Sequence, residues 1–157
     1  MPKSLKICRG GLEMENYIGV KMIKAEPCTA WKDTGEYKVG DAGYKVLYED
    51  GYESWSPKEI FEKAYRKFNI DQNKITQKDV DGFITEVEVK QVRDNTVLVI
   101  VTLANGFTLS ETSACVDPKN FSMDIGVECC MEKIKDKVWF LLGFLLQCAN
   151  GMNKGLE

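Results

Sequence analysis

Residues 96–115 read TVLVIVTLANGFTLSETSAC and predict a β-hairpin at the centre of the fold. The run Thr96–Leu103 is apolar or β-branched, which is typical of a central strand buried on both faces. Asn105-Gly106 follows it and is the strongest short hairpin signal in the sequence. We therefore expect residues 107–115 to return as the partner strand.

Three further stretches alternate between apolar and polar residues, as half-buried strands do. They are residues 17–26, residues 43–55 and residues 85–92. The first is expected to stop at Pro27 and to lead into a loop over residues 28–42. The second predicts a hairpin that turns at Asp50-Gly51, a pair in which both residues can adopt positive φ.

Three helices are predicted from start signals and apolar spacing. Ser56-Pro57-Lys58-Glu59 has the pattern of a capping box with proline at the first helical position, and predicts a helix over about residues 57–68. Thr76-Gln77-Lys78-Asp79 resembles a second such start, of a short helix that ends near Phe83. Residues 121–147 predict a long helix. Its apolar stripe is expected to be Ile125, Cys129, Cys130, Ile134, Val138, Leu141, Leu142 and Leu145.

These elements predict an α+β fold: an antiparallel sheet with hairpins, short capped helices, and a long C-terminal helix or helix pair packed on it. Three segments follow from the pattern. Residues 1–16 are expected to be a flexible extension, residues 17–69 a β-hairpin and helix module, and residues 70–157 a second domain of sheet and C-terminal helices.

The composition argues against several classes of partner. The chain has 157 residues, a net charge of −3 and a pI of about 5.2, whereas non-specific nucleic-acid binding usually needs a basic surface. The longest apolar run, residues 138–146, is too short to span a bilayer, so no membrane association is expected. Residues 1–16 lack the apolar core of a secretory signal. We expect a cytoplasmic protein.

The sequence contains no histidine, which excludes Ser-His and Cys-His nucleophile systems. The six cysteines form no C-x-x-C pair and are expected to be free thiols. We therefore predict no metal site, no cofactor and no enzymatic activity. A weak hydrolase that uses carboxylates remains a third alternative, although it would need a metal site that the sequence does not supply.

Residues 113–118 form the densest cluster of small and polar residues at an element boundary. They can be read as a structural corner between a strand and a helix, with Asn120 or Ser122 as the helix cap. They can also be read as an anion or nucleotide pocket, because a helix N-terminus offers unpaired amides and the positive end of its dipole. Both readings stay open at this point.

Aromatic residues predict a second kind of surface, which suits either base stacking or a protein partner, although aromatic hairpins are also common in small cores. Tyr44, Tyr52 and Trp55 lie in the predicted hairpin, where alternation places some side chains on an exposed face. Trp139 and Phe144 lie where the C-terminal helix becomes apolar on all sides. That end either plugs the core or packs against another chain, so a homo-oligomer is expected.

Two sets of motifs resemble phage proteins. The first set resembles a family of small phage proteins named after the gene 49 and gene 66 products of two phages. Its motifs are Asn105-Gly106-Phe107, Ser113-Ala114-Cys115-Val116-Asp117-Pro118, Asn120-Phe121, Ile125-Gly126, Trp139 and Leu145-Leu146. The second set is similar to a module often found in front of that family. Its motifs are Tyr17-Ile18-Gly19-Val20-Lys21, Gly43-Tyr44, Tyr48-Glu49-Asp50-Gly51-Tyr52 and Ser54-Trp55-Ser56-Pro57-Lys58-Glu59.

The resemblance implies an accessory protein of a phage or prophage, of the kind that often counteracts host defence. We expect it to bind without catalysis and to sequester a nucleotide-derived immune signal, either a cyclic nucleotide or an ADP-ribose-type ligand. The expected ligand contacts are Asn105, Phe107, Ser113, Asp117 and Asn120, with Lys119 or Lys135 for phosphate. Val127-Glu128 stand where the family usually carries basic residues, which argues against a phosphate clamp on this helix. The alternative is an anti-CRISPR-like inhibitor that binds a host defence protein through an acidic and aromatic surface.

Overall fold

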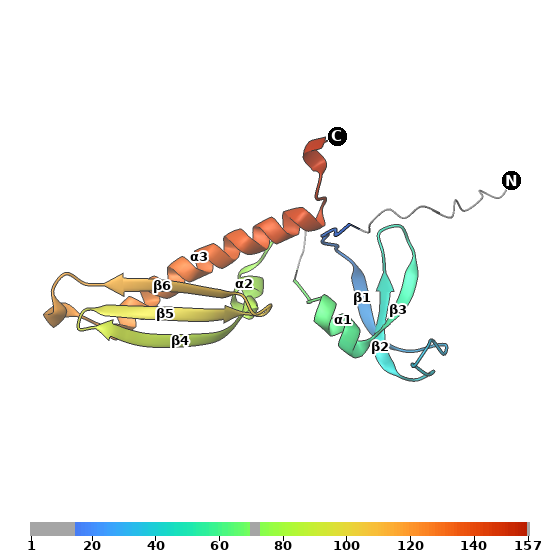
Figure 1. The fold of residues 1–157 in the computed structure, drawn as a ribbon, viewed down its shortest axis with the longest axis horizontal. Coiled ribbons are helices and arrows are strands. Elements are labelled where there is room, and N and C mark those ends of the chain that lie inside the picture. The colour runs from blue at the N-terminus through green and yellow to red at the C-terminus, as the bar shows by residue number, and fades with distance from the viewer. Residues whose placement is uncertain (1–14, 70–72, 157) are drawn as a thin grey trace.

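The computed structural model describes residues 15–69 and 73–156, and within them the chain has the predicted α+β fold. Two three-stranded antiparallel sheets follow one another along the chain (Figure 1). The first unit contains β1 (Lys24–Thr29), β2 (Ala42–Leu47), β3 (Glu53–Pro57) and the helix α1 (Lys58–Ala64). Its strands lie in the order β1-β2-β3. Of the predicted extension over residues 1–16, all but Glu15 and Asn16 lie outside the described residues.

The second unit contains the long C-terminal helix and a sheet with strand order β4-β5-β6. Its elements are α2 (Gln77–Phe83), β4 (Ile84–Arg93), β5 (Thr96–Leu103), β6 (Thr108–Ala114), the short 3₁₀ helix η1 (Pro118–Asn120) and α3 (Met123–Ala149). A second 3₁₀ helix, η2 (Lys154–Leu156), follows α3. Across residues 15–69 and 73–156, no helix has both the length and the apolar character needed to cross a membrane.

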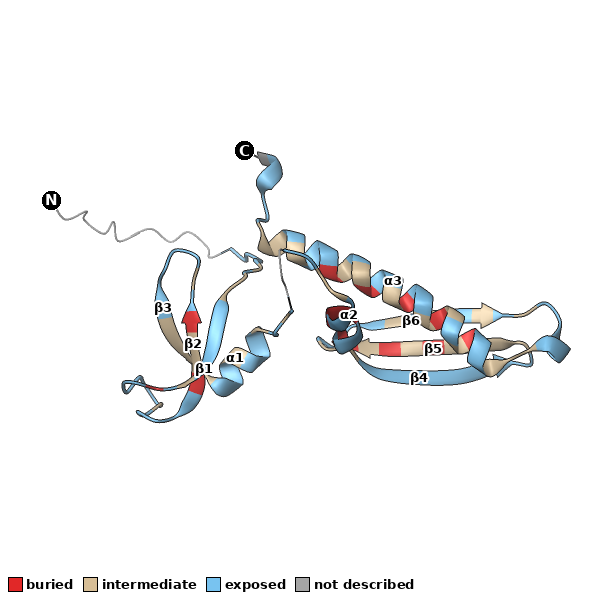
Figure 2. Cartoon of the chain, turned by 180° about the vertical axis from the view of Figure 1, so that it is seen from behind, coloured by how far each residue is buried: buried red, intermediate tan, exposed pale blue. Residues whose placement is uncertain are grey.

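The main core lies between α3 and one face of the second sheet (Figure 2). Alternate residues of β5 are buried there, namely Val97, Val99, Val101 and Leu103. They meet the buried stripe of α3, which consists of Cys130, Ile134, Val138 and Leu142. The other face of β5 is only half-buried, so the expectation of a strand buried on both faces was wrong: α3 covers one side of the sheet.

The helix α3 is one continuous helix, two residues offset from the predicted range. Its stripe differs from the prediction at Leu145, which is 37% exposed, and at Ile125, which is also exposed. Gly126 is buried in its place, because the helix approaches β5 so closely that a Cβ atom at this position would lie 2.5 Å from Cγ1 of Val97. The prediction placed Ile125 in the buried stripe because it is the larger apolar residue, whereas the close approach of the helix to β5 requires the smaller Gly126.

The start of α2 is a capping box, as predicted. The Thr76 hydroxyl accepts a hydrogen bond from the Asp79 amide, and the Asp79 carboxylate accepts one from the Thr76 amide at 2.9 Å. Asp79 is a buried carboxylate whose burial alone would raise its pKa. Hydrogen bonds from Thr76 and Asn69 outweigh that effect and lower the pKa below 3.8.

Three predictions for the first unit were wrong. The helix is shorter than expected, since α1 ends at Ala64 and Tyr65 is already extended, whereas the prediction ran to about residue 68. The first strand begins at Lys24 rather than residue 17, and it runs through Pro27. A proline is tolerated there because β1 is an edge strand. The predicted capping box before α1 does not form, since Ser56 is paired with Tyr44 inside the sheet and Pro57 makes no side-chain cap.

The β2–β3 and β5–β6 hairpins turn in the same way, through three-residue loops rather than the expected two-residue turns. In the first, the Gly51 amide donates to the Tyr48 carbonyl, and in the second the Gly106 amide donates to the Leu103 carbonyl. Only the glycine has positive φ, +85° in both loops. This geometry is a type I turn followed by a glycine bulge.

Candidate functional site

The chain turns a corner between β6 and α3, and a small hollow lies at this corner. The corner hollow has a volume of about 170 Å³. It is lined by Ser113, Ala114, Cys115, Asn120, Phe121, Ser122, Ile125 and Gly126. Ser122 is the N-cap of α3, and its hydroxyl accepts a hydrogen bond from the Ile125 amide. Of the predicted ligand residues, Ser113 and Asn120 therefore line one cavity.

Hydrogen bonds within the chain hold this corner in shape. The Asp117 carboxylate accepts from the Lys119 amide at 2.9 Å and caps η1. The Cys115 thiol donates to the Asp117 carbonyl at 3.0 Å. The Asn95 side chain donates to the Cys115 carbonyl at 2.7 Å. Asp117 thus orders its own backbone, and Lys119 is exposed beside it.

The remaining predicted ligand residues lie elsewhere. Thr96 pairs with Ala114 at one end of the β5–β6 hairpin and Thr102 with Thr108 at the other, so the two ends are separated by about 20 Å. Asn105 and Phe107 lie at the far end. The Asn105 side-chain oxygen accepts from the Phe107 amide at 3.1 Å. Asp50 accepts from the Tyr52 amide in the same manner in the first hairpin, so this bond belongs to the turn.

Lys135, the second candidate for phosphate, is paired within the chain. Its ammonium group lies 2.9 Å from the carboxylate of Asp81, which lowers the pKa of that carboxyl together with a hydrogen bond from Gln77. The pair joins α3 to α2 and is far along α3 from the corner hollow, since nine residues of helix, about 13 Å, separate Gly126 from Lys135. The structure therefore divides the predicted ligand set among three places.

A wider, open depression of about 580 Å³ lies between residues 66–69 and α2. Several of its polar groups are paired within the chain. The Asp79 carboxylate accepts from the Asn69 amide at 2.7 Å and from the Thr76 hydroxyl at 2.6 Å. The Arg66 guanidinium donates to the Gly82 carbonyl at 2.6 Å and lies over the ring of Phe83. These contacts hold the segment that follows α1 against α2, which is a structural role.

Two of the aromatic residues predicted as a partner surface support the first unit from within. The Tyr44 hydroxyl donates to Glu62 at 2.8 Å, and its ring is stacked on Phe61 at 4.1 Å between centroids. The hydrogen bond to Glu62, with burial and the nearby charge, raises the pKa of Tyr44 above 10.0. The Trp55 indole donates to the Cys28 carbonyl at 3.0 Å. Of the three predicted hairpin aromatics, only Tyr52 is exposed.

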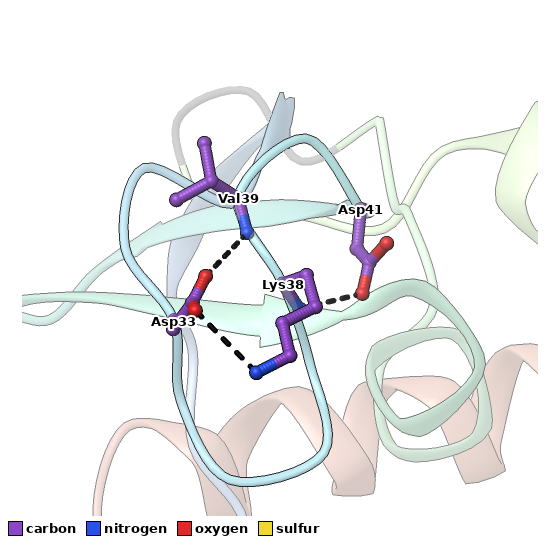
Figure 3. Close-up of polar contacts among 4 residues, drawn as sticks. All are labelled: Asp33, Lys38, Val39 and Asp41. Carbon is purple, nitrogen blue, oxygen red and sulfur yellow. Dashed lines mark hydrogen bonds and ion pairs between the residues drawn. The ribbon is translucent and has the colours of Figure 1, made fainter.

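The loop between β1 and β2 is held in a defined conformation (Figure 3). The Asp33 carboxylate accepts from the Val39 amide at 2.9 Å and pairs with the Lys38 ammonium at 3.4 Å. The Asp41 carboxylate accepts from the Lys38 amide at 2.8 Å. The loop exposes Trp31 and Val39. Sequence analysis treated these residues only as part of a loop, and the aspartates close to glycines were the available signal of its order.

The C-terminal half of α3 exposes large apolar side chains. Phe140 is 75% exposed and Phe144 is 67% exposed, one helical turn apart, and Leu145 lies beside them. We call these three residues the aromatic end of α3. Trp139, also predicted, instead packs against the core. Phe140 was missed, although its spacing of four residues from Phe144 would have indicated a shared face.

The described residues contain no group of three or more carboxylates or thiols that could hold a metal ion. Residues 75–149 match the family described as Phage protein (N4 Gp49/phage Sf6 gene 66). The second unit therefore carries a segment of this phage family. The resemblance predicted from the NGF and SACVDP motifs is thereby confirmed for the Gp49/gene 66 segment, whereas the module in front of it lies outside the matched range and stays a prediction. No curated protein and no solved structure matches the chain significantly.

Proposed function

We propose that this chain is a phage accessory protein that counteracts host defence by binding a host protein, without catalysing a reaction. The family supports the phage context. The observation that carries the choice of a protein partner is the aromatic end of α3, where Phe140 and Phe144 remain largely exposed on a helix whose other face is anchored in the core. Partly exposed aromatic clusters on rigid elements are typical of protein-binding hot spots.

The position of this surface on α3 supports the proposal. The last residue of α3 that is fully buried is Leu142, so the helix continues beyond the core by about two turns. Those turns carry apolar side chains in place of the charged residues that usually cover an exposed helix face. Asp136, one helical turn before Phe140, is exposed and supplies part of a polar rim.

The test is affinity capture from the lysate of a defence-active host, followed by measurement of binding with the purified partner. Wild-type protein is expected to retain one defence component in stoichiometric amount. The double variant Phe140→Ser/Phe144→Ser is expected to weaken that binding by at least about a hundredfold, as for the loss of two hot-spot side chains.

Phe107→Ser is the matched control, because Phe107 is an exposed phenylalanine of the same unit at the tip of a hairpin. It should bind as wild type does. Circular dichroism and thermal melting must show that all variants stay folded. Equal binding by the double variant would contradict this role for α3.

A second candidate function is sequestration of a nucleotide-derived signal, and the corner hollow is the observation that favours it. Ser113 and Asn120 line the hollow beside the N-terminus of α3, where backbone amides and the helix dipole favour an anion. Its volume of about 170 Å³ is below the roughly 300–1,000 Å³ of typical small-molecule sites. The hollow therefore suits a phosphate group of a ligand whose remaining part lies on the surface.

Calorimetry with a panel of cyclic dinucleotides and ADP-ribose tests this second candidate. Binding at the corner should be weakened by Asn120→Ala and should be unchanged in Asn105→Ala, which lies at the other end of the hairpin. If no member of the panel gives a measurable heat of binding, the nucleotide-sequestration candidate is rejected and the protein-binding function is the one that stands.

A further inference from the structure

The strand β4 is a long edge strand with a free outer side. It has ten residues and pairs only with β5 among the described strands. Figure 1 shows β4 at the lower margin of the second sheet, with no other element drawn along it. The outward-facing amide and carbonyl groups of such a strand are able to pair with another strand.

Residues Val87 and Val89 make one face of this edge apolar. They lie opposite Val101 and Val99 of β5 and therefore on the side of the sheet that α3 covers. They nevertheless remain 47% and 42% exposed, because α3 packs over β5 and β6. Edge strands are commonly protected by a charged side chain that points toward the covered face, and the centre of β4 has none there.

The other face of β4 carries charges of both signs. Glu88 and Lys90 alternate with the valines and form an exposed ion pair at 2.7 Å. Val89 lies between them. The sequence around this valine is therefore self-complementary: when the strand is reversed about Val89, Glu88 takes the place of Lys90 and Lys90 takes the place of Glu88.

We propose that β4 is the interface for a second copy of this chain, paired antiparallel about a two-fold axis at Val89. A two-fold axis that relates antiparallel edge strands is normal to the sheet, so one residue must lie opposite its own copy. With Val89 at the axis, each Glu88 lies opposite Lys90 of the second copy. An axis at Glu88 would oppose two carboxylates, and an axis at Lys90 would oppose two ammonium groups.

The resulting dimer is a continuous sheet in which the two three-stranded sheets join through β4. Both copies of α3 lie on the same side of it, and the half-exposed valines of the two chains come together on that side. The aromatic end of α3 takes no part in the pairing, so this dimer is independent of the proposed protein partner. Self-association was predicted through the C-terminal helix, whereas β4 is the element with self-complementary charge.

Size-exclusion chromatography with light scattering over a concentration series tests the charge pairing on the full chain. Wild type is expected to form dimers. Lys90→Glu should raise the dissociation constant by about tenfold or more, because it places carboxylates opposite each other at two positions. The charge swap Glu88→Lys/Lys90→Glu restores opposite charges at both positions and should recover the dimer. Lys58→Glu, a matched charge change in α1, should have no effect.

Disulfide cross-linking between the two chains tests the register of the paired β4 strands. Val89 lies opposite its own copy, with Cα atoms about 5 Å apart, so Val89→Cys should form an inter-chain disulfide under mild oxidation. In the same register Val87 is displaced from its own copy by four residues, about 13 Å, so Val87→Cys should not. The wild-type chain measures the background from native thiols. A monomer at all concentrations, a dimer that ignores the charge swap, or a cross-link at position 87 in place of 89 would overturn the proposal.

Discussion

The two units of this chain have sheets of the same strand order and hairpins with the same turn, yet they are covered in very different ways. The helix α1 has seven residues, none of them buried, whereas α3 has 27 residues and a continuous buried stripe. Of the twelve buried apolar residues in the described chain, ten belong to the core of the second unit and only Ala30 and Val46 to the first. The length of the covering helix, rather than the topology of the sheet, accounts for the difference in core size between the two units.

The first unit is stabilised largely by half-buried aromatic contacts. Tyr44, Phe61 and Tyr65 form a stacked row, with centroid distances of 4.1 and 5.1 Å. Such contacts contribute about 0.5–1.5 kcal/mol each beyond area burial. A three-stranded sheet with so small a core has little reserve of stability. We therefore expect the second unit to be the more stable of the two and to set the global stability.

The largest effect is expected from Ile134→Ala in the centre of the second core. Ile134 is fully buried between α3 and β5, so its truncation leaves a cavity and should lower the free energy of unfolding by about 2–5 kcal/mol. Urea denaturation followed by circular dichroism measures this change. A decrease in the free energy of unfolding of less than about 1 kcal/mol would mean that the stability of the second unit does not depend on this core.

Val46→Ala is the matched change in the first unit. Val46 is 1% exposed, and removal of its two methyl groups should cost about 2 kcal/mol. Because the two sheets are separate, we expect only the first unit to be destabilised. In a Trp139→Phe background, where the remaining Trp31 and Trp55 both lie in the first unit, fluorescence should change at lower urea than the helical signal of α3. Coincident transitions in this variant would show that the units unfold together.

Gly126→Ala should produce a smaller loss, in the second unit. The added Cβ atom meets the stiff side chain of Val97, an overlap that typically costs about 1–3 kcal/mol. The higher helix propensity of alanine returns up to about 1 kcal/mol. The net expectation is a decrease of about 1 kcal/mol. Gly143→Ala, at an exposed helical position with free space, is the control and should be neutral or stabilising.

The sequence predicted the second unit better than the first, for a physical reason. The central strand, the Asn105-Gly106 hairpin, the Thr76 capping box and the long helix all carry strong local signals, and each was found. In the first unit, strand pairing overrode the local signal, since Ser56 and Pro57 are drawn into β3 by their partners on β2. A capping motif is a local pattern and does not depend on whether a neighbouring strand is available for pairing. Here the pairing with β2 determined where β3 ends and α1 begins.

The candidate site was less predictable than the fold. Asn105 and Lys135 were grouped with Ser113 on chemical type, but the first is at the opposite end of the hairpin and the second is paired with Asp81. Polar residue types do not reveal which side chains already have partners within the chain. Phe140 was overlooked because an apolar run on a helix does not indicate which of its side chains face away from the core.

Acid should weaken the second unit through Asp79. Its pKa is lowered in the folded state, so the stabilisation that it contributes is complete well above pH 3.8 and is lost as the pH falls through the lower folded value. Thr76→Ala removes hydroxyl contacts to Asp79 and should reduce both the stability at neutral pH, by about 1 kcal/mol, and its acid dependence. Thermal melts between pH 2 and pH 6 (roughly the window set by an ordinary carboxyl pKa) measure both effects.

Alkali should act on the first unit instead, and this is the smallest effect expected. The hydrogen bond to Glu62 raises the pKa of Tyr44, so the neutral phenol is favoured in the folded state. Its contribution is complete below pH 10.0 and is lost as the pH rises through the higher folded pKa. Tyr44→Phe keeps the stacking on Phe61 and removes the hydroxyl, so the melting temperature of the first unit should depend less on pH above 10.0 in this variant.

Tyr52→Phe removes an exposed hydroxyl without such a bond to a carboxylate and should leave the pH dependence as in wild type. If both variants behave alike, the Tyr44–Glu62 pair does not contribute to the stability of the first unit.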